Sequence, residues 1–148
     1  MSIITFMRQH HSHCDELFVA AEEAAHRKDW DATRAAVTRF ATDIEAHFAA
    51  EEERLFPAFE HATGSAMGPT QMMRMEHAQM RGLLDQMSAA VTARDLDAYA
   101  GAAETLLVLM QQHNMKEENI LYPMCDRALH GDEMVNILNQ RLGAASAT

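Results

Sequence analysis

Residues 106–124 read LLVLMQQHNMKEENILYPM, and this stretch decides the fold. Most of its residues are good helix formers, and neither proline nor glycine interrupts it before Pro123. At about 100° per residue, one helix face carries both His113 and Glu117 together with apolar side chains. These apolar side chains are Leu106, Leu109, Met110, Ile120 and Met124. The stretch therefore predicts a helix that turns an imidazole and a carboxylate toward a protein core.

The same reasoning, extended outward, divides the 148 residues into helices separated by turn signals. Helices are predicted at residues 2–27, from about 29 to 61 with a bend at Pro57, and at 69–94, 95–129 and 132–142. The predicted N-caps are Asp29 or Asp31, Asp95, and Asp132. Pro69 suits the first turn of its helix.

Short connections between long helices imply antiparallel neighbours. We therefore predict an all-α fold, an up-down-up-down antiparallel four-helix bundle over about residues 2–129 with a short C-terminal helix. The length is that of one domain, so residues 1–148 are taken as a single domain.

Composition excludes several classes of partner. Twelve Lys and Arg against 22 Asp and Glu give a formal charge of −10, which repels nucleic acid and anionic lipid. No stretch approaches the roughly 20 apolar residues of a membrane span. The first ten residues show no basic segment followed by an apolar run, so a secretion signal is not expected. We predict a cytoplasmic protein with no nucleic-acid or membrane partner, whose two cysteines are reduced thiols.

A second His-x-x-x-Glu occurs at His47 and Glu51, again on an apolar helix face. His77 shares a face with Met73, Leu84 and Val91, and His10 shares one with Ile3, Phe6 and Leu17. Counted from the turns at about 1.5 Å per residue, all six polar groups fall within roughly 6–8 Å along the bundle axis. The six are His10, His47, Glu51, His77, His113 and Glu117.

Burying these groups without partners would cost several kcal/mol each, and a metal removes that cost. Mixed imidazole and carboxylate ligands on facing bundle helices suit a di-iron or di-manganese site, and spacing alone does not separate the two metals. Zinc is less natural because no cysteine joins the cluster.

Several residues carry more than one interpretation. His13 lies one turn after His10 and is an alternative ligand, or a residue that orients one. His11 and Asp15 have the spacing of a surface ion pair. Arg81 either extends to the bundle surface or hydrogen-bonds a bound anion. A set of acidic residues is expected to point outward into solvent: Glu52, Glu53 and Glu118.

With these residues in view, the chain resembles the haemerythrin-like (HHE cation-binding) domain family, and most closely the di-iron domain of iron–sulfur centre repair proteins. The matching stretches are His10–Leu17, His47–Glu51 running into Leu55–Pro57, Ala66–Pro69 leading to Glu76 and His77, and His113–Pro123. The resemblance implies that four histidines, His10, His47, His77 and His113, are terminal ligands. It also implies that Glu51 and Glu117 bridge two iron ions, with an oxo or hydroxo bridge between them.

Oxygen-carrying haemerythrins have a second histidine one turn from the equivalent of His77, where this chain has Met73 and Arg81. The resemblance therefore implies an open position on at least one iron. We expect a protein that reacts with or senses O2, NO or peroxide, or that donates iron to a protein partner in stress repair. The alternative is a metal-dependent sensor or interaction module without catalysis, and a metal-free helical interaction domain is the third hypothesis. A homodimer is a further candidate assembly, and the residues do not decide whether the chain is an enzyme.

Overall fold

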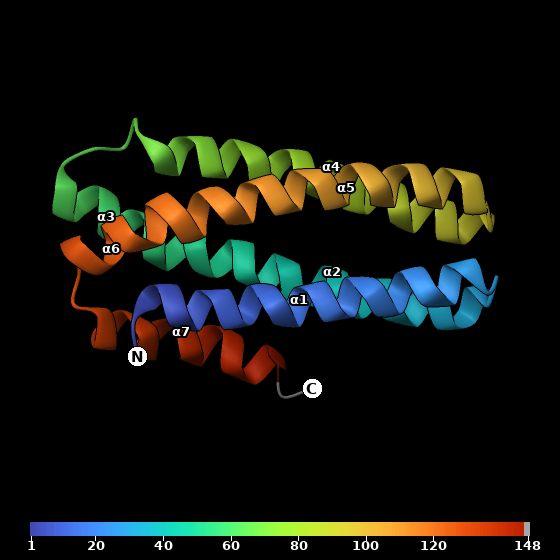
Figure 1. Ribbon diagram of the computed structural model, residues 1–148, viewed down its shortest axis with the longest axis horizontal. Coiled ribbons are helices and arrows are strands. Elements are labelled where there is room, and N and C mark those ends of the chain that lie inside the picture. The colour runs from blue at the N-terminus through green and yellow to red at the C-terminus, as the bar shows by residue number, and fades with distance from the viewer. Residues whose placement is uncertain (147–148) are drawn as a thin grey trace.

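The computed structural model describes residues 1–146, and the side chains up to Gly143. Every element in this range is helical, so the predicted all-α class is confirmed and the molecule is a helical bundle (Figure 1). The elements are α1 (Ile3–His26), α2 (Trp30–Ala50), η1 (Glu51–Leu55), α3 (Phe56–Thr63), α4 (Pro69–Ala93), α5 (Leu96–Lys116), η2 (Glu117–Leu121), α6 (Tyr122–Ala128) and α7 (Gly131–Ser146).

The helix starts follow the local chemistry of the sequence. The side chains of Asp29 and Asp95 accept the backbone N–H groups of Ala32 and Ala98, as predicted for the starts of α2 and α5. α4 begins at Pro69, also as predicted. The predicted cap Asp132 is wrong, because α7 already begins at Gly131 and Asp132 lies inside its first turn.

The two long predicted helices that contain His-x-x-x-Glu are each interrupted by a π-helical turn. In η1 the Phe56 N–H bonds to the Glu51 carbonyl, and in η2 the Tyr122 N–H bonds to the Glu117 carbonyl, five residues back in both cases. A proline follows each turn, at positions 57 and 123, and cannot donate to the carbonyl four residues before it. The wider turn accommodates that proline, and such turns are frequent at functional sites.

Buried apolar residues form two clusters, one at each end of the bundle. One cluster joins α1, α2, α4 and α5 and includes Phe18, Phe40 and Met87. The other lies where α3, α6 and α7 pack against the start of α1, and includes Phe56 and Leu138. Figure 1 shows α3 and α6 together at one end of the molecule, with α7 alongside α1.

A layer of buried polar side chains separates the two apolar clusters. On α4, for example, Met73 belongs to one cluster and Met80 to the other, and His77 lies between them. Five histidines and two glutamates are buried in this layer: His10, His11, His47, Glu51, His77, His113 and Glu117. The expectation that the predicted groups share one depth in the bundle is consistent with this arrangement.

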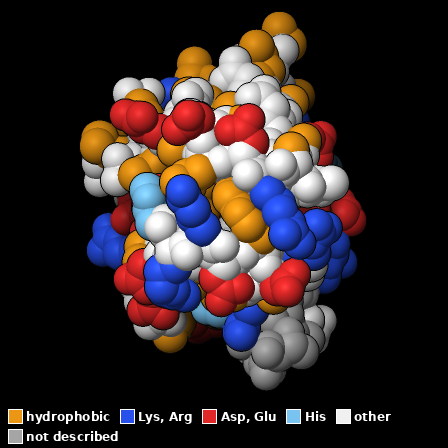
Figure 2. All heavy atoms as spheres, turned by 90° about the vertical axis from the view of Figure 1, so that its right-hand side faces the viewer, with side chains coloured by type: hydrophobic (Ala, Val, Ile, Leu, Met, Phe, Trp, Pro, Cys, Tyr) orange, Lys and Arg blue, Asp and Glu red, His pale blue; other side chains and the backbone are white. Residues whose placement is uncertain are grey.

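At the end of the bundle formed by the α1–α2 and α4–α5 connections, acidic and basic side chains are interspersed with apolar ones (Figure 2). The negative net charge is therefore not concentrated at that end. Within the described part of the chain, each helix is too short or too polar to cross a membrane.

Candidate metal centre

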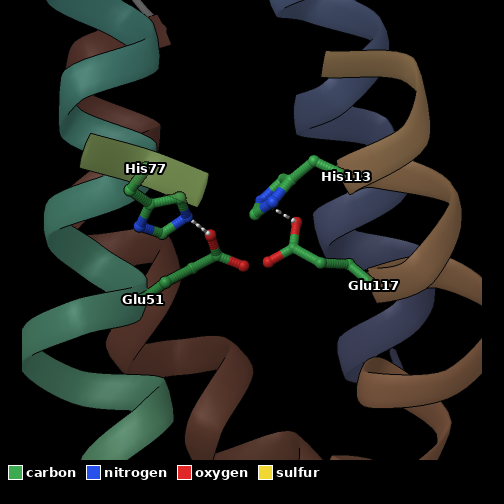
Figure 3. Close-up of side chains that lie close together, drawn as sticks. All are labelled: Glu51, His77, His113 and Glu117. Carbon is green, nitrogen blue, oxygen red and sulfur yellow. Dashed lines mark ion pairs between the residues drawn. The ribbon is translucent and has the colours of Figure 1, made fainter. Parts of the chain in front are cut away.

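Four side chains from four elements point toward one another in the polar layer (Figure 3). They are Glu51 of η1, His77 of α4, His113 of α5 and Glu117 of η2, and their ligand atoms lie within 4.8 Å of one another. His77 Nε2 lies 3.1 Å from Glu51 Oε1, and His113 Nε2 lies 3.2 Å from Glu117 Oε1. The structure thus brings together these four predicted residues, and their role as ligands stays a prediction.

A second set of possible ligands shares Glu117 with the first. Ligand atoms of His11, His47 and Glu117 also lie within 4.8 Å of one another. His47 Nε2 lies 3.5 Å from Glu51 Oε1, which connects this set to the other carboxylate as well. Two sets of ligands that share one carboxylate suit two neighbouring cations.

His11, not His10, is the α1 histidine that reaches this second set. His11 Nε2 lies 3.1 Å from Glu117 Oε1, so the predicted surface pair of His11 with Asp15 is wrong. The reason is the phase of α1. Its buried stripe runs through Ile3, Met7, Cys14 and Phe18 rather than through Phe6 and Leu17, which are half-buried. Positions 10 and 11 flank that stripe on either side, and both are buried.

His10 lies behind His47 rather than in the cluster. The Nδ1 atoms of His10 and His47 are 2.8 Å apart, so one donates to the other. Burial, followed by the charge of His47, lowers the pKa of His10 to about 3, so His10 is neutral. The alternative ligand His13 is directed elsewhere, because its Nε2 lies 2.6 Å from Oδ2 of the buried Asp43.

Three imidazoles of the centre are oriented by carboxylates that hydrogen-bond to Nδ1. His77 Nδ1 donates to Glu52 (2.6 Å), His113 Nδ1 to Glu76 (2.8 Å), and His11 Nδ1 to Glu118 (2.8 Å). Such contacts fix the tautomer, so that Nε2 is free to bind a metal. The prediction that Glu52 and Glu118 are solvated is wrong, whereas Glu53 is exposed as predicted.

Each of these carboxylates is in turn held by a basic side chain. Arg81 donates to Glu52 (2.9 Å), Lys116 to Glu76 (2.5 Å), and Arg8 to Glu118 (3.0 Å). Arg81 extends toward the bundle surface, as the first of its two predicted interpretations has it, and its guanidinium binds the exposed Glu45 as well as Glu52. Although partial burial raises the pKa of Glu52, its contacts with Arg81 and His77 hold it below the ordinary value, so it stays anionic.

Tyr122 belongs to the centre and was missed by sequence reasoning. Its hydroxyl is fully buried and lies 2.7 Å from Glu51 Oε2 and 2.9 Å from Glu117 Oε1, so its single proton can be donated to either. Burial and then the negative charge of Glu117 raise its pKa well above the ordinary value, which keeps it protonated. One feature of the sequence could have pointed to Tyr122. An aromatic residue followed by proline comes after each His-x-x-x-Glu, as Phe56-Pro57 and as Tyr122-Pro123.

The charges of the metal-free centre are balanced by protons. Burial lowers the pKa of His11, but hydrogen bonds to Glu117 and Glu118 outweigh it and raise that pKa to about 9. Burial also lowers the pKa of His113, and the charge of Glu117 raises it to about 9. Burial raises the pKa of Glu51, yet imidazoles, His47 first, hold it well below its ordinary value. A cation that entered the site would displace the imidazole protons.

The residues fit a metal by a second criterion, the buried atoms without a hydrogen-bond partner. Within the described residues, four of these atoms belong to side chains of the first set: Glu51 Oε1, His77 Nε2, His113 Nε2 and Glu117 Oε2. An unsatisfied buried polar atom is costly, and such atoms are rare in native proteins. A cation would satisfy all four at once, so this cluster of imidazole and carboxylate groups is suited to metal binding.

Comparison with known proteins agrees with this assignment. No protein of curated function and no solved structure matches the chain. The family model described as the Hemerythrin HHE cation binding domain matches residues 2–125, which include every residue of both ligand sets. The match covers most of the chain and ends within α6, before the terminal helix α7. This chain therefore belongs to the haemerythrin-like family of HHE cation-binding domains.

Proposed function

We propose that the chain is a non-haem di-iron protein that reacts with or senses a small molecule such as O2, NO or peroxide. The observation that carries the proposal is the sharing of Glu117 between two sets of converging ligand atoms. In this proposal His77 and His113 serve one ion, His11 and His47 serve the other, and Glu51 and Glu117 bridge them. The proposal also takes the four long helical stretches to alternate in direction, as their short connections favour.

The ligand chemistry favours iron. Imidazole nitrogen and carboxylate oxygen suit non-haem iron, and neither cysteine belongs to the ligand sets. Bound iron would supply redox chemistry and Lewis acidity at the centre. The protein's own part is to hold the imidazoles by Glu52, Glu76 and Glu118, to exclude water, and to keep a proton on Tyr122 close to both bridging carboxylates.

An open coordination position follows from a count of ligands. The α4 helix contributes one histidine, and the positions four residues away on either side hold Met73 and Arg81. Met73 is packed in an apolar cluster, and Arg81 is bound to Glu45 and Glu52, so neither replaces the missing imidazole. A small molecule from solution could then bind the iron at the coordination position for which α4 supplies no second imidazole. Iron donation to a partner, and a homodimer, stay predictions.

The stoichiometry of bound iron tests this proposal directly. Freshly purified protein should hold about two iron atoms per chain, and its near-ultraviolet absorption should shift when azide or NO is added. One tightly bound atom per chain would contradict the di-iron assignment. Tight binding of two zinc ions in preference to iron would contradict the choice of metal.

A metal-dependent sensing or interaction module without catalysis is favoured by one observation. Met72 and Met75 on α4 and Met115 on α5 are all more than half exposed, and methionine is frequent at protein-binding surfaces. Decay of peroxide or NO separates the two functions. Turnover of many equivalents per chain indicates an enzyme, whereas stoichiometric binding with no turnover indicates a sensor.

A further inference from the structure

The outer sides of α4 and α5 each carry a stripe of exposed residues without charge. On α4 the stripe has heptad spacing and consists of Met72, Met75, Gln79, Gly82, Gln86 and Ala89. On α5 the same spacing gives Gly101, Thr105, Val108, Gln112 and Met115. Heptad spacing places the members of each set on one side of their helix. We call the two sets together the α4–α5 stripes.

The two stripes lie side by side, because α4 and α5 pack against each other along their length (Figure 1). Glu76, near the start of α4, binds Lys116 at the end of α5. This ion pair lies between the helices and adds no net charge. The charged residues that are exposed on α4 and α5 fall outside the stripes: Asp85, Asp97 and Glu104. The stripes therefore form a continuous uncharged surface on a chain whose formal charge is −10.

Large apolar side chains that are exposed gather on this surface. Of the eight within the described residues, four belong to the stripes: Met72, Met75, Val108 and Met115. A fifth, Ile120, lies in η2 directly after α5. Single exposed apolar residues are ordinary in proteins, whereas their concentration on one face marks a surface that binds a partner.

Two glycines of the stripes give independent support. Gly82 and Gly101 lie inside α4 and α5, where glycine destabilises a helix relative to alanine. A Cβ at either position would meet nothing within 4 Å, so no contact within the described chain requires glycine there. Glycine on the outer side of a helix lets another backbone approach closely. Both positions therefore fit a partner that is itself helical.

We propose that the α4–α5 stripes are the interface of a homodimer, in which a second copy packs its own α4 and α5 against them across a two-fold axis. A pair of helices with the same heptad spacing matches the stripes, and the second copy supplies that pair. Two chains of charge −10 repel each other, and this face brings them together without opposing charged side chains. A basic partner would instead be attracted to the acidic parts of the surface.

The polar residues and the size of the stripes also suit a two-fold interface. A glutamine amide both donates and accepts, so Gln79, Gln86 and Gln112 can hydrogen-bond to the same side chains of the second copy. The α4 stripe is about 26 Å long, and two neighbouring helices are about 20 Å wide. These dimensions give about 500 Å² on each copy, which reaches the total of about 1,000 Å² that a specific interface needs.

Sedimentation of the iron-containing protein over a range of concentrations tests the proposal. We expect a monomer–dimer equilibrium that stops at two copies, because a two-fold face closes on itself. The double variant Gln79→Glu with Gln112→Glu places like charges in the interface without changing side-chain size. It should raise the Kd of the dimer about 100-fold or more.

The matched control is the double variant Gln111→Glu with Gln140→Glu. It adds the same charge at exposed positions outside the stripes and should change the Kd by about threefold or less. A dimer that both double variants weaken equally would overturn the proposal. A monomer at every concentration would overturn it as well, and would leave the face to a different helical protein.

Gly82→Leu separates dimerisation from folding. Leucine has the higher helix propensity, so the Tm of dilute, monomeric protein should not fall. The side chain would stand between the two copies and should raise the Kd of the dimer about tenfold or more. Ala35→Leu, on an exposed part of α2, is the control and should leave the Kd unchanged. Unchanged dimerisation in Gly82→Leu would contradict the close approach of the two copies.

This inference does not rest on the proposed function, because the stripes contain none of the residues of the two ligand sets. Iron content is therefore measured in the same samples. All of these variants should keep the iron content of the unchanged protein. Protein that dimerises without binding iron would contradict the proposed function alone, and monomeric protein with two irons would contradict the dimer alone.

Discussion

The two sides of the candidate centre hold their imidazoles by different means. On the α4–α5 side, His77 and His113 each donate to a carboxylate, which is in turn bound by Arg81 or Lys116. On the α2 side, His47 faces another imidazole, the neutral His10. A carboxylate behind a ligand imidazole increases its basicity and fixes its orientation, whereas an imidazole behind it adds no charge. The half with His77 and His113 therefore has a carboxylate behind each imidazole, whereas the other half has a carboxylate, Glu118, behind His11 but only a neutral imidazole behind His47.

The largest effect is expected from the residue that both halves share. Glu117→Ala should remove both ions, because Glu117 belongs to each ligand set. Iron analysis of the purified variant measures this loss. Glu53→Ala, at an exposed glutamate of the same type, is the control and should keep its iron. A variant at position 117 that kept two irons would show that the two halves do not share this carboxylate.

A smaller loss is expected when one half loses a histidine. His11→Ala should lower the iron content by about one atom per chain, because His11 is in the second set alone. His13→Ala should change little, since His13 is bound to Asp43 outside both sets. If the variant at position 13 lost iron and the variant at position 11 kept it, the α1 assignment would have to be reversed.

Isosteric variants can measure how a carboxylate and an imidazole differ in their effect on metal affinity when each accepts the N–H of a ligand histidine. Glu52→Gln and Glu76→Gln keep an acceptor for the imidazole N–H but remove the charge, and each should weaken metal binding about 10- to 100-fold. His10→Gln likewise keeps an acceptor for His47, and no charge is lost, so we expect a change of about threefold or less. Competition with a chelator gives the affinities. Equal losses in all three variants would remove the distinction between the halves.

The smallest effect concerns the pH dependence of the metal-free protein. His11 and His113 have pKa values of about 9 in the folded state, above the ordinary 6.5. Their contribution to the free energy of unfolding is therefore fully present below pH 6.5 and is lost as the pH rises through about 9. The Tm of metal-free protein should fall over that range, as measured by circular dichroism. The metal-loaded protein should lack this dependence, because the metal has already displaced the protons.

Much of this architecture was predictable from the chain alone. The structure confirms the predicted caps Asp29 and Asp95 and the predicted helix start at Pro69. These features, like helix propensity, depend only on residues that are close in the sequence. The convergence of His77 with Glu51, His113 and Glu117 was predictable as well, because four-residue spacing and distance from the turns are regular in a helix.

What escaped prediction depends on small rotations and on contacts between helices. The buried stripe of α1 is rotated by roughly 60° from the predicted one, and this decides that His11 rather than His10 reaches Glu117. The π turns change the helix phase after Glu51 and Glu117, which leaves Ile120 exposed although a regular helix would bury it. The same local changes bring Glu52 and Glu118 back to the imidazoles.

The sequence by itself determined that this protein is helical, where α2, α4 and α5 begin, and that a set of imidazoles and carboxylates gathers at one depth, because these properties follow from local propensity and helical periodicity. Tertiary structure alone decided which α1 histidine faces the carboxylates, which acids support the imidazoles, and that Tyr122 lies between Glu51 and Glu117. Those outcomes depend on how separate helices rotate and pack against one another, and no single helix carries that information.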